Sequence, residues 1–287
     1  MGVTTDRGVG PARLVINADD LGFTPGVNRG IFECAAAGTV TSASVMVNTP
    51  GFDDAMQGRA SVKLGLGLHL NLIDGAPLSG ARSLVNPATG DCWPFARFLA
   101  RATAGAIAAA DVRAEVTAQL RRLKAAGVTS THLDSHRHTH VHPAIWPAVL
   151  EAARAEGVGV VRLPREPLSS HAMRAGATIS KVLLGVAMAG GATRAAAARA
   201  GLRTADHFAG ISLQGSGTFE DDILALLAAL EPGVTELAVH PGYVDDELRA
   251  RDGYLAERES EVRALTGARV RAALAAFGPR LTDFGTS

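Results

Sequence analysis

The chain has 287 residues, and its 28 lysines and arginines balance 28 aspartates and glutamates, so the formal net charge is zero. This length accommodates one or two domains, and 47% hydrophobic residues suffice to bury a full core. The neutral balance argues against nucleic acid or an anionic membrane as the main partner. The two cysteines, Cys34 and Cys92, are too few for a disulfide framework or a thiolate metal site. Nine histidines stand outside the charge balance, and five of them lie from His132 to His142.

The sequence shows neither a secretory signal nor a membrane span. Its first residues lack the apolar stretch of about 7–15 residues that a signal requires. The most apolar run, residues 182–189, lies between Lys181 and Arg194 and falls short of the ~20 residues that cross a bilayer. We therefore expect a soluble protein of the reducing cytoplasm.

Short apolar runs alternate with helical segments along the chain. The first run, residues 13–18, predicts a buried strand that ends at the pair Asp19-Asp20. The next segment begins with Pro25 and stops at Gly38, positions that helices favour for these residues. Further helices are expected at residues 112–126, with Asp111 as N-cap and Gly127 at the C-terminal end, and at residues 143–156. Further strands are expected at residues 43–47, 64–72, 131–134, 158–163, 207–213 and 236–240, and residues 281–284 are another candidate.

Seven or eight strands that alternate with helices imply an α/β protein with a parallel sheet, either open or closed into a barrel. No glycine-rich dinucleotide fingerprint follows the first strand, and no GxxxxGK[ST] phosphate loop occurs. Two segments fit the alternation badly: residues 74–100 are rich in Pro and Gly, and residues 169–203 are rich in Ala, Gly and Arg. We interpret both as excursions from a single domain that covers residues 1–287.

Unusual polar residues gather at the carboxyl ends of the predicted strands, where parallel α/β folds bind their ligands. Random placement would spread such residues over both ends, so this end of the sheet is expected to carry the function. The residues are Asp19 and Asp20 after the first strand, His69 near the end of the third, Asp134, His136 and His138 after the fourth, and Arg162 and His240 at the ends of later strands.

The adjacent carboxylates Asp19 and Asp20 allow two interpretations. They are a helix cap and a solvated turn residue, or one ligates a metal while the other accepts a proton from the water that this metal activates. His69, which interrupts an apolar strand, is either a hydrogen-bonded core residue or a ligand. For His240, which precedes a Pro-Gly turn, the alternatives are a bond to the turn backbone and protonation of a leaving group.

The segment HLDSHRHTHVH is the strongest signal in the sequence. If extended, it places His136, His138 and His140 on one face, and His132 and Asp134 share that phase. Imidazole suits Zn, Fe or Ni, whereas oxygen-rich sites favour Mg or Mn. A pH-responsive surface loop is the alternative. Neither an HExxH zincin motif nor a GxSxG nucleophile elbow occurs, so a different kind of metal site is indicated.

Five sequence blocks occur in the order NADDLGFTPGVNRGI, TSASVMVN, GLHLNL, THLDSHRHTHVHPAIW and HPGYVD. Together they resemble the YdjC-like carbohydrate deacetylases, a family that includes chitooligosaccharide deacetylases and a branch associated with hopanoid biosynthesis. The resemblance covers residues 13–164 and 204–246. It implies a distorted (β/α) TIM-like barrel and metal-dependent hydrolysis of the N-acetyl group of an amino sugar or oligosaccharide, with release of acetate.

The resemblance also implies roles for individual residues. Asp20, His69 and His136 correspond to the ligands of one divalent metal ion, and Asp19 corresponds to the catalytic base. The family is associated with Mg²⁺, but two imidazoles and one carboxylate suit Zn²⁺ equally. A homodimer is a further expectation from the family.

The acid and the substrate contacts are defined less closely. His240 or His138 lines the substrate subsite or serves as the acid; we assign the acid to His240 and substrate contacts to His138 and Arg162. A chitooligosaccharide, a lipid-linked amino sugar and an antibiotic precursor all present the same acetamide. Two other functions stay open: a metal-dependent phosphoesterase or amidohydrolase, for which Arg137, Arg162 and Arg165 are available, and a non-catalytic sugar-binding protein.

Overall fold

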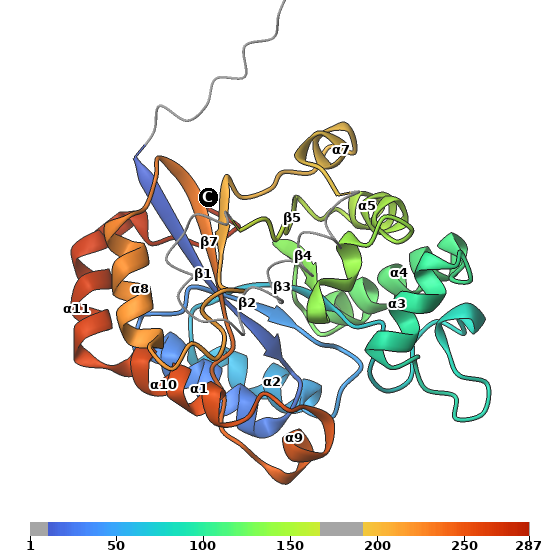
Figure 1. Cartoon of the computed structure of the whole chain (residues 1–287), viewed down its shortest axis with the longest axis horizontal. Helices are drawn as coiled ribbons and strands as arrows, with labels where there is room; N and C mark the ends of the chain where they lie inside the picture. Colours follow the sequence, from blue (N-terminus) through green and yellow to red (C-terminus); the bar gives the residue numbers. More distant parts are fainter. Residues whose placement is uncertain (1–10, 167–191, 287) are drawn as a thin grey trace, which may run out of the picture.

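The computed structural model describes residues 11–166 and 192–286 (Figure 1). The described strands form one sheet of seven, and every pairing in it is parallel, in the order β5-β4-β3-β2-β1-β7-β6. The strands are β1 Ala12–Leu21, β2 Ser42–Val45, β3 Gly65–Leu70, β4 His132–Ser135, β5 Val160–Val161, β6 His207–Ala209 and β7 Gly233–Val239.

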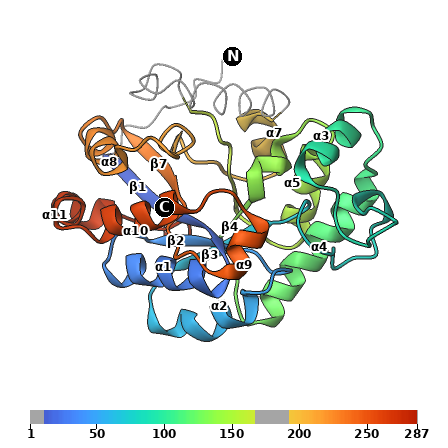
Figure 2. The ribbon, with the colours of Figure 1, turned by 60° about the horizontal axis from the view of Figure 1, so that its bottom comes forward.

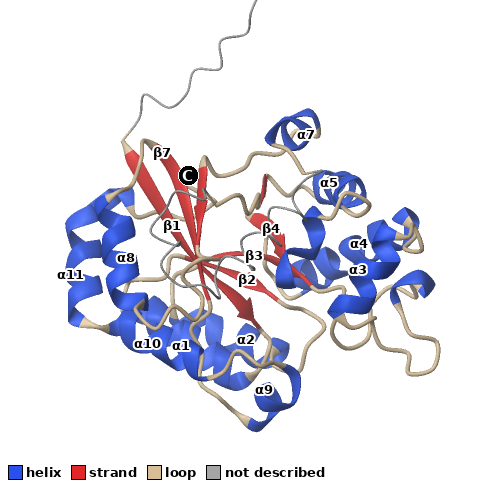
Figure 3. Ribbon diagram, in the orientation of Figure 1, coloured by secondary structure: helices blue, strands red, loops and turns tan. Residues whose placement is uncertain are grey.

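Helices lie outside this sheet, as expected when each parallel crossover carries a helix (Figures 1 and 3). In Figures 1 and 2, α1, α2, α8, α10 and α11 gather beside β1, whereas α3, α4 and α5 lie beyond β4. The α-helices are α1 Pro25–Ala36, α2 Phe52–Gly58, α3 Phe95–Thr103, α4 Ala109–Ala125, α5 Trp146–Ala155, α7 Arg194–Arg199, α8 Phe219–Ala228, α9 Asp246–Arg251, α10 Ala256–Thr266 and α11 Ala268–Phe277; the 3₁₀ turns are η1 Arg59–Ser61, η2 Arg82–Leu84, η3 His136–Val141 and η5 Gly278–Arg280.

The sheet curls until its two edges approach one another. Val160 of the edge strand β5 forms a parallel bridge with Arg203, which lies four residues before the other edge strand, β6. The backbone N–H of Val161 donates to the carbonyl of Arg203 at 2.9 Å, and the Arg203 N–H donates to Gly159 at the same distance. The α/β half-barrel that results confirms the predicted distorted barrel.

β1 runs farther than the sequence predicted, through the Asp19-Asp20 pair to Leu21. Its pairing with β2 shifts register there, since Ala18 faces Ala43 and Leu21 faces Val45, so β1 carries one extra residue. Asp20 adopts a left-handed backbone with φ of 69°. Neighbouring side chains of a regular strand point to opposite faces, and a bulge re-aims them. This irregularity allows two consecutive carboxylates to reach the same pocket.

Other predicted boundaries shift for local reasons. α4 begins at Ala109, and the predicted cap Asp111 instead accepts a hydrogen bond from the Ser83 backbone at 2.7 Å. β6 ends at Ala209 because Gly210 has φ of 131° and turns the chain away. The predicted β5 shortens to Val160–Val161, α5 begins at Trp146 after the turn η3, and 281–284 contributes only a bridge from Leu281 to Leu14.

The two predicted excursions differ in how far they can be followed. Residues 74–100 hold η2, an antiparallel bridge between Val85 and Cys92, and the start of α3. Most of 169–203 falls on residues 167–191, outside the described residues, and α7 follows. The interpretation of the chain as one domain stays a prediction. Within the described ranges, no helix combines the length and the apolar character needed to cross a membrane.

Candidate active site

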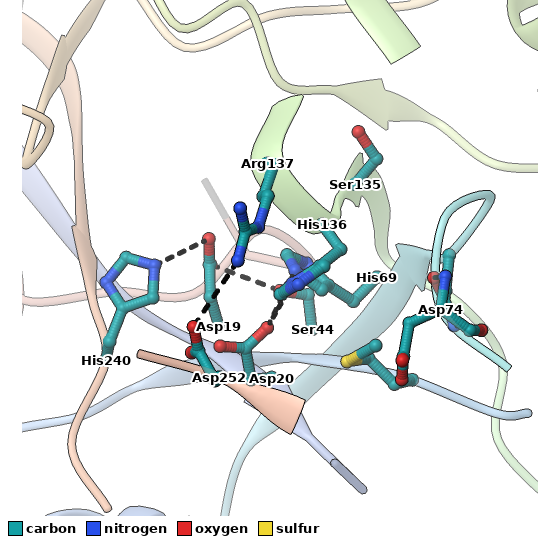
Figure 4. A network of polar contacts seen from close by, with 12 residues as sticks. Asp19, Asp20, Ser44, His69, Asp74, Ser135, His136, Arg137, His240 and Asp252 are labelled. Atoms are coloured by element: carbon teal, nitrogen blue, oxygen red, sulfur yellow. Dashed lines mark hydrogen bonds and ion pairs between the residues drawn. The ribbon is translucent and has the colours of Figure 1, made fainter. Parts of the chain in front are cut away.

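The carboxyl ends of the strands surround a pocket with a volume of about 520 Å³. Asp19 and Asp20 enter it from β1, His69 from β3, His136 and His138 from η3 after β4. The loop after β7 supplies a further histidine, and the opposite wall comes from residues 252–258 together with Phe95 of α3 and two residues of the loop after β6, Ile211 and Gln214. Figure 4 shows the side chains of the strand ends converging on this space. Of the eight polar residues predicted at this end of the sheet, six line the pocket, namely Asp19, Asp20, His69, His136, His138 and His240, whereas Asp134 and Arg162 do not.

Asp20, His69 and His136 form a compact cluster at the floor of the pocket. Asp20 Oδ1 lies 3.1 Å from His69 Nε2 and 2.9 Å from His136 Nδ1. One ligand atom from each residue lies within 4.8 Å of the others, and all three residues are buried. Two imidazoles and one carboxylate are a known ligand set for a catalytic divalent ion and leave coordination positions for water or substrate. The donor set therefore fits the metal that the sequence predicts.

His69 is held between two carboxylates. Its Nδ1 lies 2.8 Å from Asp134 Oδ1 while its Nε2 faces Asp20. Burial alone would lower the pKa of His69, but Asp134 and Asp20 outweigh burial and raise it to about 10. A carboxylate behind a histidine fixes its ring orientation and raises its basicity, which is how metal-binding imidazoles are commonly supported. Asp134 thus orients His69 toward Asp20.

Asp19 lies beside this cluster and bonds to none of its three members. Its Oδ1 accepts hydrogen bonds from Asn17 Nδ2 at 2.8 Å and from Ser44 Oγ at 3.2 Å. Arg162 grips both oxygens, with Nη1 and Nη2 each 2.6 Å away. Burial would raise the pKa of the Asp19 carboxyl, but the Arg162 guanidinium reverses this and holds the pKa below its ordinary value. Asp19 is therefore an ionised, oriented carboxylate that faces the pocket.

Arg162 lies beneath the pocket rather than in its wall, which differs from the substrate contact expected for it. Its side chain is fully buried, and its guanidinium forms ion pairs with three carboxylates. Besides Asp19, it pairs with Asp134 at 2.7 Å and with Glu236 at 2.7 Å. A group enclosed in this way cannot reach a substrate without leaving buried charges unpaired. Its place in the structure is that of a support for Asp19 and Asp134.

The histidine segment is not extended, so the prediction that alternate histidines share one face is wrong. β4 ends at Ser135, and the chain turns into η3, in which Arg137 and His138 have left-handed φ values of 53° and 54°. The turn keeps His136 and His138 at the pocket but sends His140 behind it. There His140 Nδ1 lies 2.6 Å from Ser135 Oγ, and its Nε2 lies 3.0 Å from the Arg162 carbonyl.

His240 stands across the pocket, directly after β7. Its Nε2 lies 3.7 Å from Asp19 Oδ2, and Gln214 Nε2 lies 3.2 Å from its ring nitrogens. Burial lowers the pKa of His240 to about 4, against the opposing pull of Asp19. Its backbone N–H donates to Glu261 at 2.5 Å, and Glu261 also accepts from the Tyr254 hydroxyl at 2.7 Å. The imidazole is therefore neutral at pH 7 and firmly placed.

Comparison with known proteins agrees with this geometry. The model of the YdjC-like protein family matches residues 13–276. The chain belongs to the YdjC-like family. A carbohydrate deacetylase of Thermoanaerobacter pseudethanolicus is 33% identical over 254 residues, which cover 88% of this chain and 90% of that protein. The human carbohydrate deacetylase is 33% identical over 94% of this chain and 89% of its own length.

A solved structure supports the same fold over nearly the whole chain. A protein of Enterococcus faecalis V583, described as a cellobiose-phosphate cleavage protein, superposes with a TM-score of 0.73. It is 26% identical and covers 96% of this chain and 98% of its own chain. The family resemblance and the fold that the sequence blocks implied are both confirmed.

Several residues around the YdjC-like site were not predicted from the sequence. Glu236 is the one charged residue of β7, a signal similar to the one that singled out His69, and Ser44 lies within a block that carried the resemblance. Arg258 and Glu261 had no such signal, because α10 reads as an ordinary charged helix. Their burial at 1% exposure is what marks them.

Proposed function

We propose that this YdjC-like protein is a metal-dependent carbohydrate deacetylase that hydrolyses the N-acetyl group of an amino sugar and releases acetate. One observation carries the proposal: a buried Asp20–His69–His136 cluster lies beside the separately held carboxylate of Asp19. Amide hydrolysis requires a metal-ligand set and, beside it, a carboxylate that is not a ligand and can act as the base, whereas binding alone needs no base. The carbohydrate deacetylases among its relatives support the same activity.

Asp20, His69 and His136 would hold the divalent ion. When bound there, the ion supplies Lewis-acid chemistry, because it polarises the acetyl carbonyl and lowers the pKa of water. Mg²⁺ follows from the family, and two imidazoles and one carboxylate suit Zn²⁺ equally. We propose Mg²⁺ as the ion, with Zn²⁺ as the alternative and as the ion used in the binding titrations.

Asp19 accepts the proton of the attacking water. Its pKa is held low by Arg162, so the carboxylate is ionised at neutral pH and releases the proton again readily. The bidentate contact with Arg162 fixes both oxygens, which spares Asp19 a reorientation during the reaction. The same contact explains why a buried arginine is needed under the pocket.

His240 delivers the proton to the amine as acetate departs. It begins neutral, since burial lowers its pKa to about 4, and it faces Asp19 across 3.7 Å. The proton that Asp19 takes from water can thus pass through the His240 ring to the nitrogen of the leaving group. His138 lines the same pocket and is proposed to contact the sugar, while Arg162 acts by holding Asp19 and Asp134.

The proposed substrate is an N-acetylated sugar without net charge. The phosphoesterase alternative needs arginines that can bind phosphate in the pocket, and two of its three candidates do not line it. Arg162 pairs with carboxylates beneath the pocket, and Arg165 donates to the Ala192 carbonyl. A chitooligosaccharide, a lipid-linked amino sugar and an antibiotic precursor present the same acetamide, so we propose all three as candidates. A homodimer stays a prediction, to be checked by sedimentation.

The test is a panel of N-acetylated sugars assayed for acetate. Metal-stripped protein is reloaded separately with Mg²⁺, Zn²⁺, Mn²⁺ or Co²⁺, and an aryl phosphate serves as the competing substrate. We expect acetate from at least one sugar in the presence of metal and no phosphate from the ester. Phosphate release without acetate would reject the proposal, and tight sugar binding without hydrolysis would favour a binding protein.

A further inference from the structure

Arg258 projects from α10 into the floor of the pocket, although 238 residues separate it from Asp20 in the chain. Its side chain is 1% exposed. Nη2 contacts Asp20 Oδ2 at 2.6 Å and Asp252 Oδ2 at 2.8 Å, and Nε donates to the Tyr254 carbonyl at 3.0 Å. Burial of an arginine is costly unless carboxylates surround it, so this residue is placed for a reason that packing alone does not supply.

The contact leaves one oxygen of Asp20 facing the two histidines and the other facing Arg258. Oδ1 faces His69 Nε2 and His136 Nδ1, whereas Oδ2 is occupied by Arg258. Only one oxygen therefore points at the place where the three ligand atoms converge. Asp20 also has a left-handed backbone, a conformation that non-glycine residues adopt mainly where the surrounding structure holds them.

The same arrangement recurs at a second ligand. His69 is held from behind by Asp134, just as Asp20 is held from behind by Arg258. In each case a buried group of opposite charge contacts the ligand on the side away from the other ligands. Such partners orient metal ligands, and their loss typically weakens metal binding by about 10–100-fold.

We propose that Arg258 is a positioning residue that holds Asp20 as a one-oxygen ligand of the metal site. The inference rests on the proposed function, because it assumes that Asp20, His69 and His136 bind an ion. Two effects of Arg258 oppose each other. Its contact orients Asp20, which favours binding of the ion, while its positive charge repels a dication. If repulsion is the stronger effect, replacement of Arg258 increases the metal affinity. If positioning is the stronger effect, as we propose, the replacement lowers the metal affinity.

The experiment titrates metal-stripped full-length protein with Zn²⁺ in a calorimeter. We expect Arg258→Met to weaken Zn²⁺ binding by about 10–100-fold. Arg258→Lys keeps the charge but lacks the planar fork, so it should restore the affinity only in part. The matched control is Arg263→Met, the same substitution at an exposed arginine of the same helix, which should leave the affinity unchanged.

Asp252→Asn provides a second variant should Arg258→Met fail to fold. This substitution removes a charge that anchors Arg258 and leaves Asp20 unchanged. In the wild type the Gly253 N–H donates to Asp252 Oδ1 at 2.8 Å, and the amide oxygen of the variant can accept the same hydrogen bond. A few-fold loss of Zn²⁺ affinity is expected, with a circular dichroism spectrum like that of the wild type. Unchanged or tighter Zn²⁺ binding by a folded Arg258→Met or Asp252→Asn protein overturns the inference. Failure of the wild type to bind any divalent ion overturns the proposed function as well, so the two failures are distinguishable.

Discussion

Arg162→Lys is the substitution whose effect the structure defines best. Arg162 makes four contacts of 2.6–2.7 Å to three carboxylates: two to Asp19, one to Asp134 and one to Glu236. A lysine keeps one positive charge but offers a compact ammonium in place of a planar fork, so at least one carboxylate loses its partner. Leaving a buried charge unpaired costs about 3–5 kcal/mol, against a total stability of roughly 5–15 kcal/mol for a domain.

The loss of stability in Arg162→Lys should depend on pH, and its sign follows from the pKa shifts. Burial opposes ionisation of Asp19 and Asp134, yet Arg162 keeps both pKa values below the ordinary 3.8. The stability that these low pKa values contribute is present above about pH 4 and is lost as pH falls through the folded-state values. Burial raises the pKa of Glu236 to about 7 despite Arg162, so in the variant this group accepts a proton first.

Urea unfolding of wild type and Arg162→Lys at pH 8 and pH 5 measures the effect. We expect a difference in unfolding free energy of about 3–5 kcal/mol at pH 8 and a smaller one at pH 5, where the unpaired carboxylates take up protons. Arg113→Lys is the control, since its ion pair with Glu151 is exposed and contributes at most ~1 kcal/mol. Equal stability of wild type and Arg162→Lys, or a difference independent of pH, would refute the assigned role of Arg162.

Two further predictions concern the metal ligands. His136→Ala should weaken Zn²⁺ binding by more than about 100-fold, which exceeds the loss typical for residues that only support a ligand. His138→Ala, two residues further along η3, should bind Zn²⁺ like the wild type and raise KM. Equal losses of Zn²⁺ affinity in calorimetry would show that His138 is also a ligand. Because Asp134 and Asp20 raise the pKa of His69 to about 10, His69 carries a proton at pH 7 that a bound ion must displace. Zn²⁺ affinity should therefore increase with pH, and one proton should be released per ion bound. Calorimetry in buffers of different ionisation enthalpy measures that proton, and binding without proton release would contradict the assignment of His69 as a ligand.

The sequence sufficed for those features that depend on short stretches of chain. Apolar runs ending in polar residues located the strands, and in a parallel sheet their carboxyl ends must meet, so Asp20, His69 and His136 could be brought together without coordinates. His240 followed by the same reasoning, because it comes directly after β7. The family resemblance added their separate roles.

The features that escaped prediction depend on contacts between distant segments. Nothing in the residues around Arg162 shows that its side chain turns inward to three carboxylates, since an arginine at a strand end serves a substrate equally well. The support of Asp20 by Arg258 links residues 238 positions apart. The bulge that turns Asp19 and Asp20 to one side depends on how β1 pairs with β2, and the sequence of one strand alone does not determine that register.

Asp19 is assigned as the base of a metal-dependent deacetylase and not as one of the metal ligands. The most direct measurement determines Zn²⁺ affinity and acetate release side by side in wild type and Asp19→Asn, with the substrate that the sugar panel identifies. This assignment predicts equal Zn²⁺ affinity of the two proteins and a kcat lower by about 10²–10⁴-fold in the variant, the usual contribution of a general base. A parallel loss of Zn²⁺ binding, or full acetate release by Asp19→Asn, would contradict it.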